Sequence, residues 1–381
     1  MKVLITGASG FVAKNLIAHL AERSDIEILR FTRQDSLERL QSLVAESEFV
    51  FHLAGVNRPM DPQEFQSGNA DLTRILCNAV KASGRKIPVL YSSSIQAELD
   101  NAYGQSKREA EKVLLELAES YHVPVHIFRL PNVFGKWARP NYNSAVATFC
   151  HNITRDLPIQ INDPNARISL VYIDDVVSKF IEVMEGKVAD DPFVQVEPQY
   201  SITVGELAEL LYAFRDSRQT LVTERVGQGL VRALYSTYVS YLPPERFTYA
   251  VPKYGDPRGT FVEMLKTPDA GQFSYFTAHP GVTRGGHYHH SKTEKFLVIK
   301  GKACFRFRHI ITGEFYELLT SGDEPEIVET VPGWTHDITN VGDDEMVVML
   351  WANEIFDRQR PDTYARPVGT RDDIPATKDL K

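Results

Sequence analysis

Two patterns of hydrophobic and polar positions divide the chain. Over roughly the first 185 residues, short apolar and β-branched runs alternate with longer segments whose apolar positions recur every three or four residues. The short runs predict strands and the longer segments predict helices. The predicted strands are residues 3–5, 26–31, 49–53, 89–92, 125–130 and 168–173, and the predicted helices include residues 69–83 and 103–121. This alternation predicts βαβ units and an α/β fold with a doubly wound parallel sheet.

The pattern changes in the second half of the chain. Residues 200–245 predict helices without strands between them, as in a small substrate-binding subdomain. The following short strands, bounded by Gly, Pro and Asp turns, predict an all-β barrel or sandwich. These strands are residues 273–277, 296–299, 303–307 and 346–351. From about Asp357 the chain is rich in Pro, Arg and Asp, which predicts an irregular segment or a surface arm. We therefore expect two domains, residues 1–245 and 246–369.

The composition narrows the range of partners. Of the 381 residues 43% are apolar and 24% are charged, the net charge is −8, and no basic cluster is present. Nucleic acid and anionic membranes are therefore not expected as partners. The chain begins directly with a predicted strand and has no apolar run of membrane-spanning length, so we expect a cytoplasmic protein. Cys77, Cys150 and Cys304 are far apart in sequence, which predicts reduced, mostly buried thiols.

The first predicted strand leads into a glycine-containing turn. Residues 6–13, Thr-Gly-Ala-Ser-Gly-Phe-Val-Ala, open a predicted helix directly after that strand. Backbone N–H groups in such a turn can approach a pyrophosphate at the helix N-terminus, although an ordinary tight turn has similar sequence signals. We expect a dinucleotide cofactor to be bound by Gly7, Ser9, Gly10, Phe11 and Val12.

The end of the second predicted strand bears on the choice of cofactor. A preference for NAD calls for an acidic side chain there, to hold the ribose 2′-hydroxyl, but this chain has Arg33. A guanidinium suits a 2′-phosphate, so the sequence favours NADPH. The alternative interpretation of Arg33 is a solvated surface charge.

Tyr103 and Lys107 lie four residues apart on a predicted helix, so their side chains share one face. A nearby cation stabilises phenolate and lowers the pKa of a tyrosine, which makes Tyr103 a candidate proton donor to a carbonyl oxygen that receives hydride. Ser94, at the end of a predicted strand, can hydrogen-bond the same oxygen. Because Tyr-x-x-x-Lys also occurs by chance in helices, the assignment depends on the surrounding motifs.

Those motifs resemble the extended branch of the short-chain dehydrogenase/reductase superfamily, which has a Rossmann-type fold. The segments that carry the resemblance are Gly7-x-x-Gly10-x-x-Ala13, His52-Leu-Ala-Gly55, Ser92-Ser-Ser94, Tyr103-x-x-x-Lys107, Arg129-Leu-Pro-Asn-Val-Phe-Gly135 and Val171-Tyr-Ile-Asp-Asp-Val176. The resemblance implies that Leu53, Ala54 and Gly55 lie along the nucleotide and that Asn132 faces a sugar-nucleotide substrate. It also implies a catalytic triad of Ser94, Tyr103 and Lys107, with Ser93 as the alternative serine.

The run from Gly281 to Gly301 spaces three potential metal ligands. Alternation along a strand sends His287 and His289 to the same face, and Glu294 can return on the adjoining strand. His336 is a fourth candidate. Three imidazoles and a carboxylate suit Zn²⁺, or alternatively Fe²⁺, Mn²⁺ or Ni²⁺. The other interpretation is a set of histidines on a polar barrel face without a metal.

This spacing resembles the first cupin motif, and residues 332–340 resemble a looser second motif, which implies a cupin, or jelly-roll, domain. Residues 256–263 and 284–288 resemble metal-free 3,5-epimerases that act on nucleotide-linked 4-keto-6-deoxy sugars. That likeness implies substrate binding by Arg258, Glu263 and Arg284.

In those epimerases the histidine at the position of His287 is the general base. One imidazole nitrogen cannot both bind a cation and take a proton. Either the metal is structural, or another residue is the base, for which Tyr288, His290 and Lys295 are the nearby candidates.

Over nearly its whole length the chain resembles the bifunctional capsular-polysaccharide enzymes that join such a reductase to a cupin. The segments that carry this resemblance include residues 51–59, 135–137, 140–143, 234–243 and 359–364. It implies a zinc-containing homodimer whose substrate is a UDP-linked 4-keto-6-deoxy amino sugar, UDP-2-acetamido-2,6-dideoxy-4-hexulose. The cupin would epimerise C3, and the reductase would use NADPH at C4 to give UDP-2-acetamido-2,6-dideoxy-L-talose, a precursor of UDP-N-acetyl-L-fucosamine.

The chemistry sets the order of the two steps, because a proton leaves C3 only while the adjacent C4 carbonyl can stabilise the carbanion. The alternatives are a UDP-4-keto-sugar reductase with a purely structural cupin, an NADPH-binding sensor or regulator, and an iron cupin dioxygenase.

Overall fold

The computed structural model describes residues 1–381 except 188–190, 257–258, 263–264, 266–270, 355–358 and 374–381. The chain forms two compact units, and neither is one continuous segment. Unit 1 comprises Met1–Ala145 and Arg167–Ile202, and unit 2 comprises Val146–Ala166 and Thr203–Lys381. The predicted division after residue 245 therefore differs from these units, since residues 203–245 group with the β-rich half.

Unit 1 is built on a parallel sheet of five strands in the order β2-β1-β3-β4-β5. The strands are β1 (Lys2–Thr6), β2 (Glu27–Phe31), β3 (Phe49–His52), β4 (Val89–Ser94) and β5 (Val125–Leu130). Its helices are α1 (Phe11–Leu20), α2 (Leu37–Glu46), α3 (Gln63–Phe65), α4 (Leu72–Ala82), α5 (Ala102–Tyr121) and α7 (Ile173–Met184), with a π-helical turn at Gln66–Asp71 and a 3₁₀ turn at Ile95–Glu98. The predicted Rossmann-type fold is confirmed.

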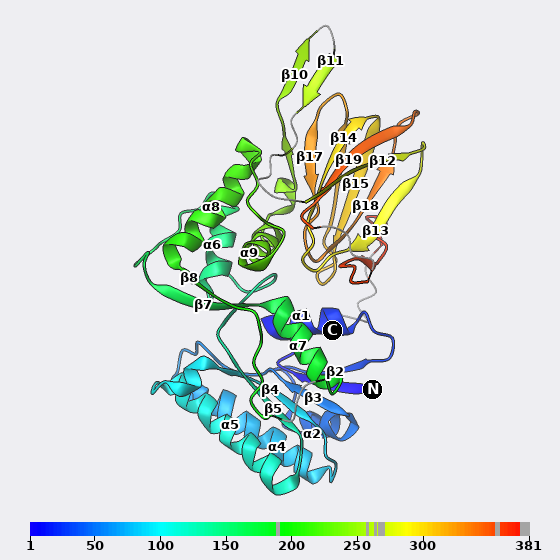
Figure 1. Ribbon diagram of the computed structural model, residues 1–381. Helices are drawn as coiled ribbons and strands as arrows, with labels where there is room; N and C mark the ends of the chain where they lie inside the picture. Colours follow the sequence, from blue (N-terminus) through cyan, green and yellow to red (C-terminus); the bar gives the residue numbers. More distant parts are fainter. Residues whose placement is uncertain (188–190, 257–258, 263–264, 266–270, 355–358, 374–381) are drawn as a thin grey trace. The chain divides into compact units, whose positions relative to one another are not determined.

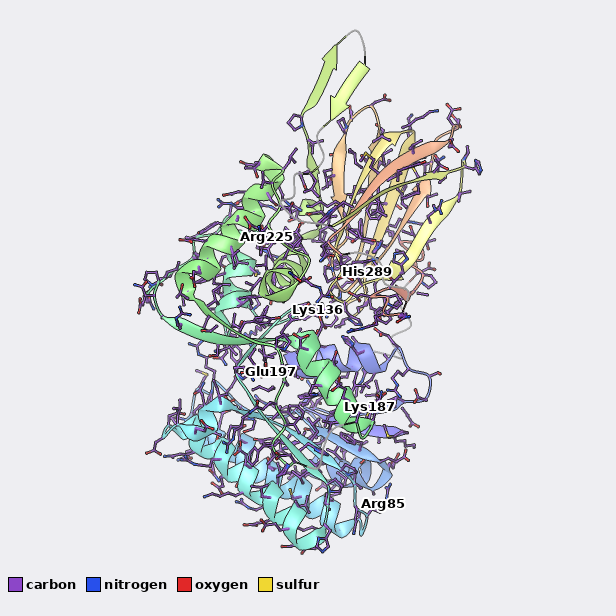
Figure 2. The ribbon with its side chains drawn as sticks, in the orientation of Figure 1. Arg85, Lys136, Lys187, Glu197, Arg225 and His289 are labelled. Atoms are coloured by element: carbon purple, nitrogen blue, oxygen red, sulfur yellow. The ribbon has the colours of Figure 1, made fainter. Side chains whose placement is uncertain are left out.

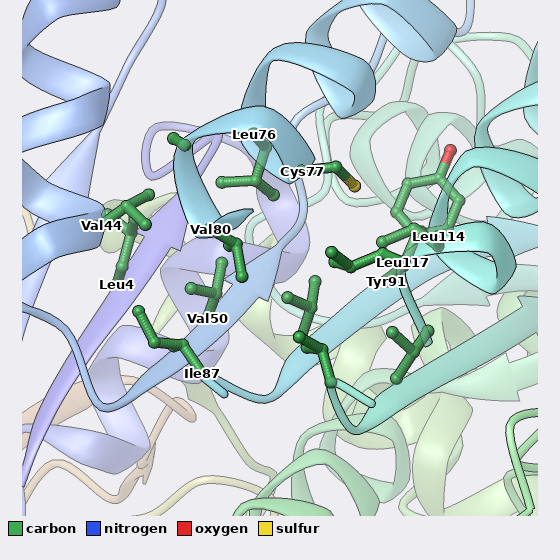
Figure 3. Packing of buried hydrophobic residues seen from close by; sticks show 14 of the residues in the cluster. Leu4, Val44, Val50, Leu76, Cys77, Val80, Ile87, Tyr91, Leu114 and Leu117 are labelled. Carbon is green, nitrogen blue, oxygen red and sulfur yellow. The ribbon is translucent and has the colours of Figure 1, made fainter. Parts of the chain in front are cut away.

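Helices cover both faces of this sheet (Figure 1). On one face, α2, α4 and α5 bury an apolar core with the strands, through residues such as Val44, Leu76 and Leu114 (Figure 3). On the other face, Phe180 of α7 packs against Phe51 of β3 and Phe128 of β5. Such double burial explains why these strands have nearly continuous apolar sequences.

One predicted strand lies elsewhere than expected. Residues 168–173 were predicted as part of the parallel sheet, but β7 (Arg167–Tyr172) belongs to a separate sheet with β6 (Asn132–Phe134) and β8 (Gln199–Thr203), in the order β6-β7-β8. An apolar strand has the same sequence pattern in either sheet, so periodicity could not separate the two.

Unit 2 begins with helices and continues as a β-barrel domain. The helices are α6 (Ala145–Ile153), α8 (Val204–Thr220) and α9 (Gly229–Ser240), followed by a 3₁₀ turn at Pro244–Arg246. Thr203 and Glu206 form a reciprocal capping box at the start of α8, which fixes where that helix begins.

Two five-stranded sheets form the barrel, in the orders β12-β19-β14-β17-β9 and β16-β15-β18-β13-β20. Its strands are β9 (Thr248–Ala250), β12 (Gln272–Ala278), β13 (Thr283–Tyr288), β14 (Glu294–Lys300), β15 (Lys302–His309), β16 (Phe315–Ser321), β17 (Glu326–Glu329), β18 (Trp334–Asn340), β19 (Met346–Ala352) and β20 (Tyr364–Ala365). A separate two-stranded sheet is formed by β10 (Lys253–Asp256) and β11 (Gly259–Val262). The inter-strand pairings are antiparallel, as the prediction of an all-β barrel or sandwich requires.

The expected irregular C-terminal arm is only partly irregular. Residues 364–365 form β20, which pairs with β13. Cys77, Cys150 and Cys304 are buried free thiols, as predicted. No helix in the described part of the chain is both long enough and apolar enough to cross a membrane.

Candidate functional site

In unit 1 the turn after β1 has the backbone shape that a dinucleotide site needs. Gly7 has φ +66°, and a Cβ there would lie 2.7 Å from Ala54 Cα, so only glycine fits. Gly10 is the N-cap of α1, and no side chain caps this helix end. Ser9 and Gly10 are exposed, whereas Phe11 and Val12 are half-buried. The first N–H groups of α1 therefore face the open side of the turn, where they can bind a phosphate.

The loop after β3 lies against this turn. The Ala54 amide donates to Thr6 Oγ1 at 3.2 Å. A Cβ on Gly55 would lie 3.2 Å from Lys107 Nζ, so the predicted cofactor residues Leu53, Ala54 and Gly55 adjoin the predicted catalytic helix.

A hydrogen-bonded chain centred on His52 holds this loop, a role for His52 that was not predicted from the sequence. His52 Nδ1 lies 2.8 Å from Thr6 Oγ1, and His52 Nε2 lies 2.9 Å from Thr73 Oγ1. Thr73 Oγ1 donates its own proton to Asn69 O, so it must accept from Nε2 of His52. Burial, and then the charge of Lys107, lower the pKa of His52 to about 3, which keeps the ring neutral. The sequence feature that could have indicated this role is the position of His52 as a lone polar residue at the end of the apolar strand β3.

Arg33 is exposed in the loop after β2. The nearest acidic residue, Asp35, accepts hydrogen bonds from the Thr32 amide at 2.7 Å and the Thr32 hydroxyl at 2.8 Å. It also pairs with Arg39 at 2.9 Å. Asp35 is thus engaged locally, and Arg33 is the charged group that this loop presents to solvent.

Tyr103 and Lys107 lie on α5, and the structure brings Ser94 to them. The Ser94 side chain is near enough to Tyr103 to lower its pKa, and Lys107 Nζ lies 6.0 Å from the centre of the Tyr103 ring. Lys107 Nζ donates to Ser92 O at 2.9 Å. Burial raises the pKa of Tyr103 by more than Ser94 lowers it, so the expected lowering of that pKa does not occur in the protein alone. Burial also lowers the pKa of Lys107 to about 8, although Glu111 opposes the change.

The alternative serine is engaged elsewhere. Ser93 is buried and donates to Glu111 Oε1. Glu111 in turn binds Arg129 through both carboxylate oxygens, at 3.0 and 2.7 Å. Of the two serines left open by the sequence, Ser94 is therefore the one whose side chain is free of the Glu111 carboxylate and acts on the pKa of Tyr103. Asn132, on β6, is exposed, and its amide donates to Ser169 O at 3.0 Å.

In unit 2 the four predicted metal ligands converge. Their ligand atoms, from His287, His289, Glu294 and His336, all lie within 4.8 Å of one another. Glu294 Oε2 lies 3.0 Å from His289 Nε2 and 3.5 Å from His336 Nε2. His287 lies on β13, and His289 lies in the loop that follows it. Glu294 is the first residue of β14, and His336 lies on β18. His289 is labelled in Figure 2, at one end of the barrel.

The residues fit a divalent metal ion. His336 is buried, and among the described residues its Nε2 has no hydrogen-bond partner, which a coordinated cation would supply. Burial and then the neighbouring imidazoles lower the pKa of His287 to about 3, and burial lowers the pKa of His336. Burial raises the pKa of Glu294, but His289 and the other neighbours outweigh it and hold that pKa well below its usual value. Neutral imidazoles and an ionised carboxylate are the protonation states that bind metals.

A cavity of about 160 Å³ opens beside this cluster. It is lined by Phe276, Arg284, Gly285, His287, Glu294, Phe296, Phe305, His336, Asp337, Ile338 and Leu350. Arg284 lines this cavity, and its role in substrate binding stays a prediction. Arg258 and Glu263, the other two predicted substrate residues, lie outside the described residues.

The three candidate bases face away from the cavity. Tyr288 and His290 alternate with His287 and His289, and both pack on Tyr364. Lys295 is buried in an ion pair with Glu329, and its Nζ lies 3.1 Å from Tyr249 Oη. None of the three lines the described cavity.

A Rossmann-type unit with a Ser, Tyr and Lys site, joined to an antiparallel barrel with a His₃Glu cluster, defines a short-chain dehydrogenase/reductase fused to a cupin. Comparisons agree with this class: residues 3–196 match the NAD dependent epimerase/dehydratase family, and residues 254–364 match the polysaccharide biosynthesis C-terminal domain. The chain belongs to the NAD dependent epimerase/dehydratase family, in the two-domain form of the capsular polysaccharide assembling protein CapF. This family implies a nicotinamide cofactor.

Two full-length relatives support this assignment. A UDP-2-acetamido-2,6-beta-L-arabino-hexul-4-ose reductase from Pseudomonas aeruginosa is 69% identical over 369 residues, covering 97% of this chain and 99% of the relative. The crystal structure of CapF from Staphylococcus aureus is 44% identical with a TM-score of 0.67, covering 97% of this chain and all of that one. A more distant relative, UDP-glucose 4-epimerase from Vibrio cholerae, is 25% identical over 248 residues, which are 55% of this chain and 74% of that protein.

Proposed function

We propose that this chain is a bifunctional sugar-nucleotide enzyme that acts on UDP-2-acetamido-2,6-dideoxy-4-hexulose. The cupin epimerises C3, and the reductase then converts the C4 ketone to an alcohol with NADPH, giving UDP-2-acetamido-2,6-dideoxy-L-talose. One observation carries this proposal: Ser94, Tyr103 and Lys107 lie together in one unit, and a His₃Glu cluster borders a cavity in the other. The reductase name of the relative from Pseudomonas aeruginosa supports the substrate class.

The reductase step needs a hydride and a proton. NADPH, when bound, supplies the hydride. The Tyr103 hydroxyl gives its proton to the C4 oxygen, and Ser94 hydrogen-bonds that oxygen as it gains negative charge. The Lys107 cation stabilises the phenolate that remains. The raised pKa of Tyr103 suits this role, because the phenol stays protonated until the substrate takes its proton.

Zinc is the metal that we expect in the cupin, held by His287, His289, Glu294 and His336. When bound, it would supply Lewis-acid polarisation of a ketone oxygen. Arg284 can pair with an anionic part of the sugar nucleotide. Epimerisation must precede reduction, because reduction removes the carbonyl that makes C3 acidic. Reduction by NADPH is strongly downhill and draws a near-thermoneutral epimerisation forward.

A second candidate function is a 4-keto-sugar reductase whose cupin is structural. It is favoured by the placement of Tyr288, His290 and Lys295, which all lie away from the cavity. A sensor that binds NADPH without turnover is disfavoured, because such a protein has no use for the Ser94, Tyr103 and Lys107 arrangement. We further propose a homodimer in the cytoplasm, where the three buried thiols would stay reduced.

Product analysis separates these functions. The purified protein is incubated with the UDP-linked 4-keto sugar, with and without NADPH, and the products are assigned by NMR. The bifunctional enzyme gives a C4 alcohol with inverted C3, and without NADPH it gives a mixture of C3 epimers. A reductase with a structural cupin gives a C4 alcohol with C3 unchanged and no reaction without NADPH.

A further inference from the structure

The loop between β13 and β14 determines where two of the four candidate ligands lie. His289 begins this loop, and Glu294 follows it as the first residue of β14. Ser291, Lys292 and Thr293 between them are buried although all three are polar. A buried polar loop keeps one conformation only if its backbone groups find partners inside the protein.

Most of those partners come from one side chain. The Asp362 carboxylate accepts from the amide of His290 at 2.9 Å and from the amides of Ser291 and Lys292 at 2.7 Å each. It also accepts from the Ser291 hydroxyl at 2.9 Å. The next two amides of the loop are taken up by other side chains: that of Thr293 donates to Asn353 Oδ1, and that of Glu294 donates to Thr330 Oγ1.

Asp362 also orients the His289 ring. Its backbone carbonyl is hydrogen-bonded to His289 Nδ1. A carbonyl oxygen can only accept, so Nδ1 carries a proton, and Nε2, 3.0 Å from Glu294 Oε2, is the nitrogen left to bind a metal. This is the tautomer in which His289 can bind a metal through Nε2.

The two residues after Asp362 contact neighbours of the candidate ligands. Thr363 Oγ1 accepts from Lys292 Nζ at 3.3 Å, and that ammonium lies 3.2 Å from Glu294 Oε1. Tyr364 pairs with Tyr288 in β20 and β13, and their rings stack with centres 5.5 Å apart. Helix α9 holds the loop from another side, since Ser236 donates to Ser291 O and Arg232 donates to Ser291 Oγ.

We propose that Asp362, Thr363 and Tyr364, here called the C-terminal brace, position the ligands of the cupin metal centre, with Asp362 as the principal positioning residue. The brace does not contact the metal. It fixes the His289 tautomer and the path of the loop, and so sets the spacing between His289 Nε2 and Glu294. This inference rests on the metal-binding part of the proposed function.

Metal affinity tests the brace. Asp362→Asn keeps the shape of the side chain but replaces one accepting oxygen with an NH₂ group, so at least one amide of the loop loses its partner. We expect Zn²⁺ affinity, measured by competition with a chromophoric chelator on the full-length protein, to fall about 10- to 100-fold. The absorption bands of bound Co²⁺ should change as well, because they report ligand geometry. Asp163→Asn is the matched control: Asp163 is an exposed carboxylate that accepts the Asn165 amide at 2.9 Å, and this variant should bind metal like the wild type.

The possible outcomes separate the brace from the metal site itself. If the wild type and His336→Ala both bind no metal, the proposed metal centre is wrong and the brace is wrong with it. If the wild type binds metal and Asp362→Asn binds equally well with an unchanged Co²⁺ spectrum, only the brace is wrong. Should Asp362→Asn fail to fold by circular dichroism, Ser291→Ala, which removes one of the four bonds to Asp362 together with the bond from Arg232, decides instead, with Arg232→Lys as the control for the second bond. Ser291→Ala should weaken metal binding by a smaller factor in the same direction, and unaltered binding would overturn the proposal.

Discussion

Glu294 and Lys295 are consecutive residues of β14, yet their side chains belong to separate polar clusters. Glu294 lies 3.0 Å from His289 in the metal cluster, whereas Lys295 pairs with Glu329 and lies next to Tyr249. Alternation along a strand explains the separation, because neighbouring side chains point to opposite faces. Lys295 is therefore a structural residue, and removing it would leave part of a buried ion pair unmatched.

Tyr103→Phe tests the proton donor of the reductase. We expect ketone-dependent NADPH oxidation to fall about 10²- to 10⁴-fold, because the phenol that protonates the C4 oxygen is absent. The dissociation constant for NADPH, followed by fluorescence titration, should change little. Tyr121→Phe is the control, since Tyr121 lies on the same helix and is 49% exposed. Equal loss of activity in both variants, or none in Tyr103→Phe, would show that Tyr103 is not the donor.

The pH dependence of reduction reports on Lys107, whose pKa burial lowers to about 8. Below that pH the ammonium is charged and can stabilise the Tyr103 phenolate, and above it the charge is lost. We expect kcat/KM for the keto sugar to decline as pH rises through about 8. Lys107→Arg stays protonated over this range, so its profile should be lower but lack this decline. A decline that persists in Lys107→Arg would assign the titration to another group.

Arg33→Ala tests the choice of cofactor. Arg33 is exposed in the loop after β2, and under the proposed function its guanidinium pairs with the 2′-phosphate of NADPH. Its loss should raise KM for NADPH about tenfold, which corresponds to the loss of about one charge-assisted hydrogen bond. KM for NADH should stay nearly unchanged. Arg85→Ala, an exposed arginine that donates to Ala45 O, is the control. A parallel rise for both cofactors would contradict a role in 2′-phosphate recognition.

The sequence predicts those parts of the sites that depend on local spacing. The four candidate metal ligands converge as predicted because strand alternation fixes the faces of His287 and His289 and because their motif spacing is short. Tyr103 and Lys107 share a face because helical periodicity places them there. Strand alternation could likewise have excluded Tyr288 as a base, since Tyr288 lies between His287 and His289 in sequence.

Other parts of the sites depend on contacts between residues far apart in sequence. Asp362 lies 72 residues beyond His290, in a segment whose composition predicts only an irregular arm. His52 and Thr73 are 21 residues apart, and neither residue alone predicts the hydrogen bonds that link them with Thr6. The choice between Ser93 and Ser94 needed the position of Glu111. Such pairings follow from tertiary packing, which local sequence patterns do not contain.

His336→Ala tests whether the cupin holds a metal. Removing one of four ligands should weaken Zn²⁺ binding by at least about 100-fold. A metal that binds only the native state stabilises it by about 2.7 kcal/mol at a hundred times its Kd. A chelator should therefore lower the unfolding temperature of the wild type, whereas His336→Ala should unfold at one temperature with or without it. His279→Ala, an exposed histidine outside the cluster, should respond to the chelator like the wild type.

Solvent deuterium uptake tests the central claim, that one chain carries two chemistries, most directly. The protein is incubated with the UDP-linked 4-keto sugar in D₂O without NADPH, and C3 is monitored by NMR and mass spectrometry. We expect deuterium at C3 in the wild type and in Tyr103→Phe, because proton removal in the cupin needs no hydride. A C3 proton that does not exchange, from a protein that still reduces the ketone with NADPH, would contradict it and leave a reductase with a structural cupin.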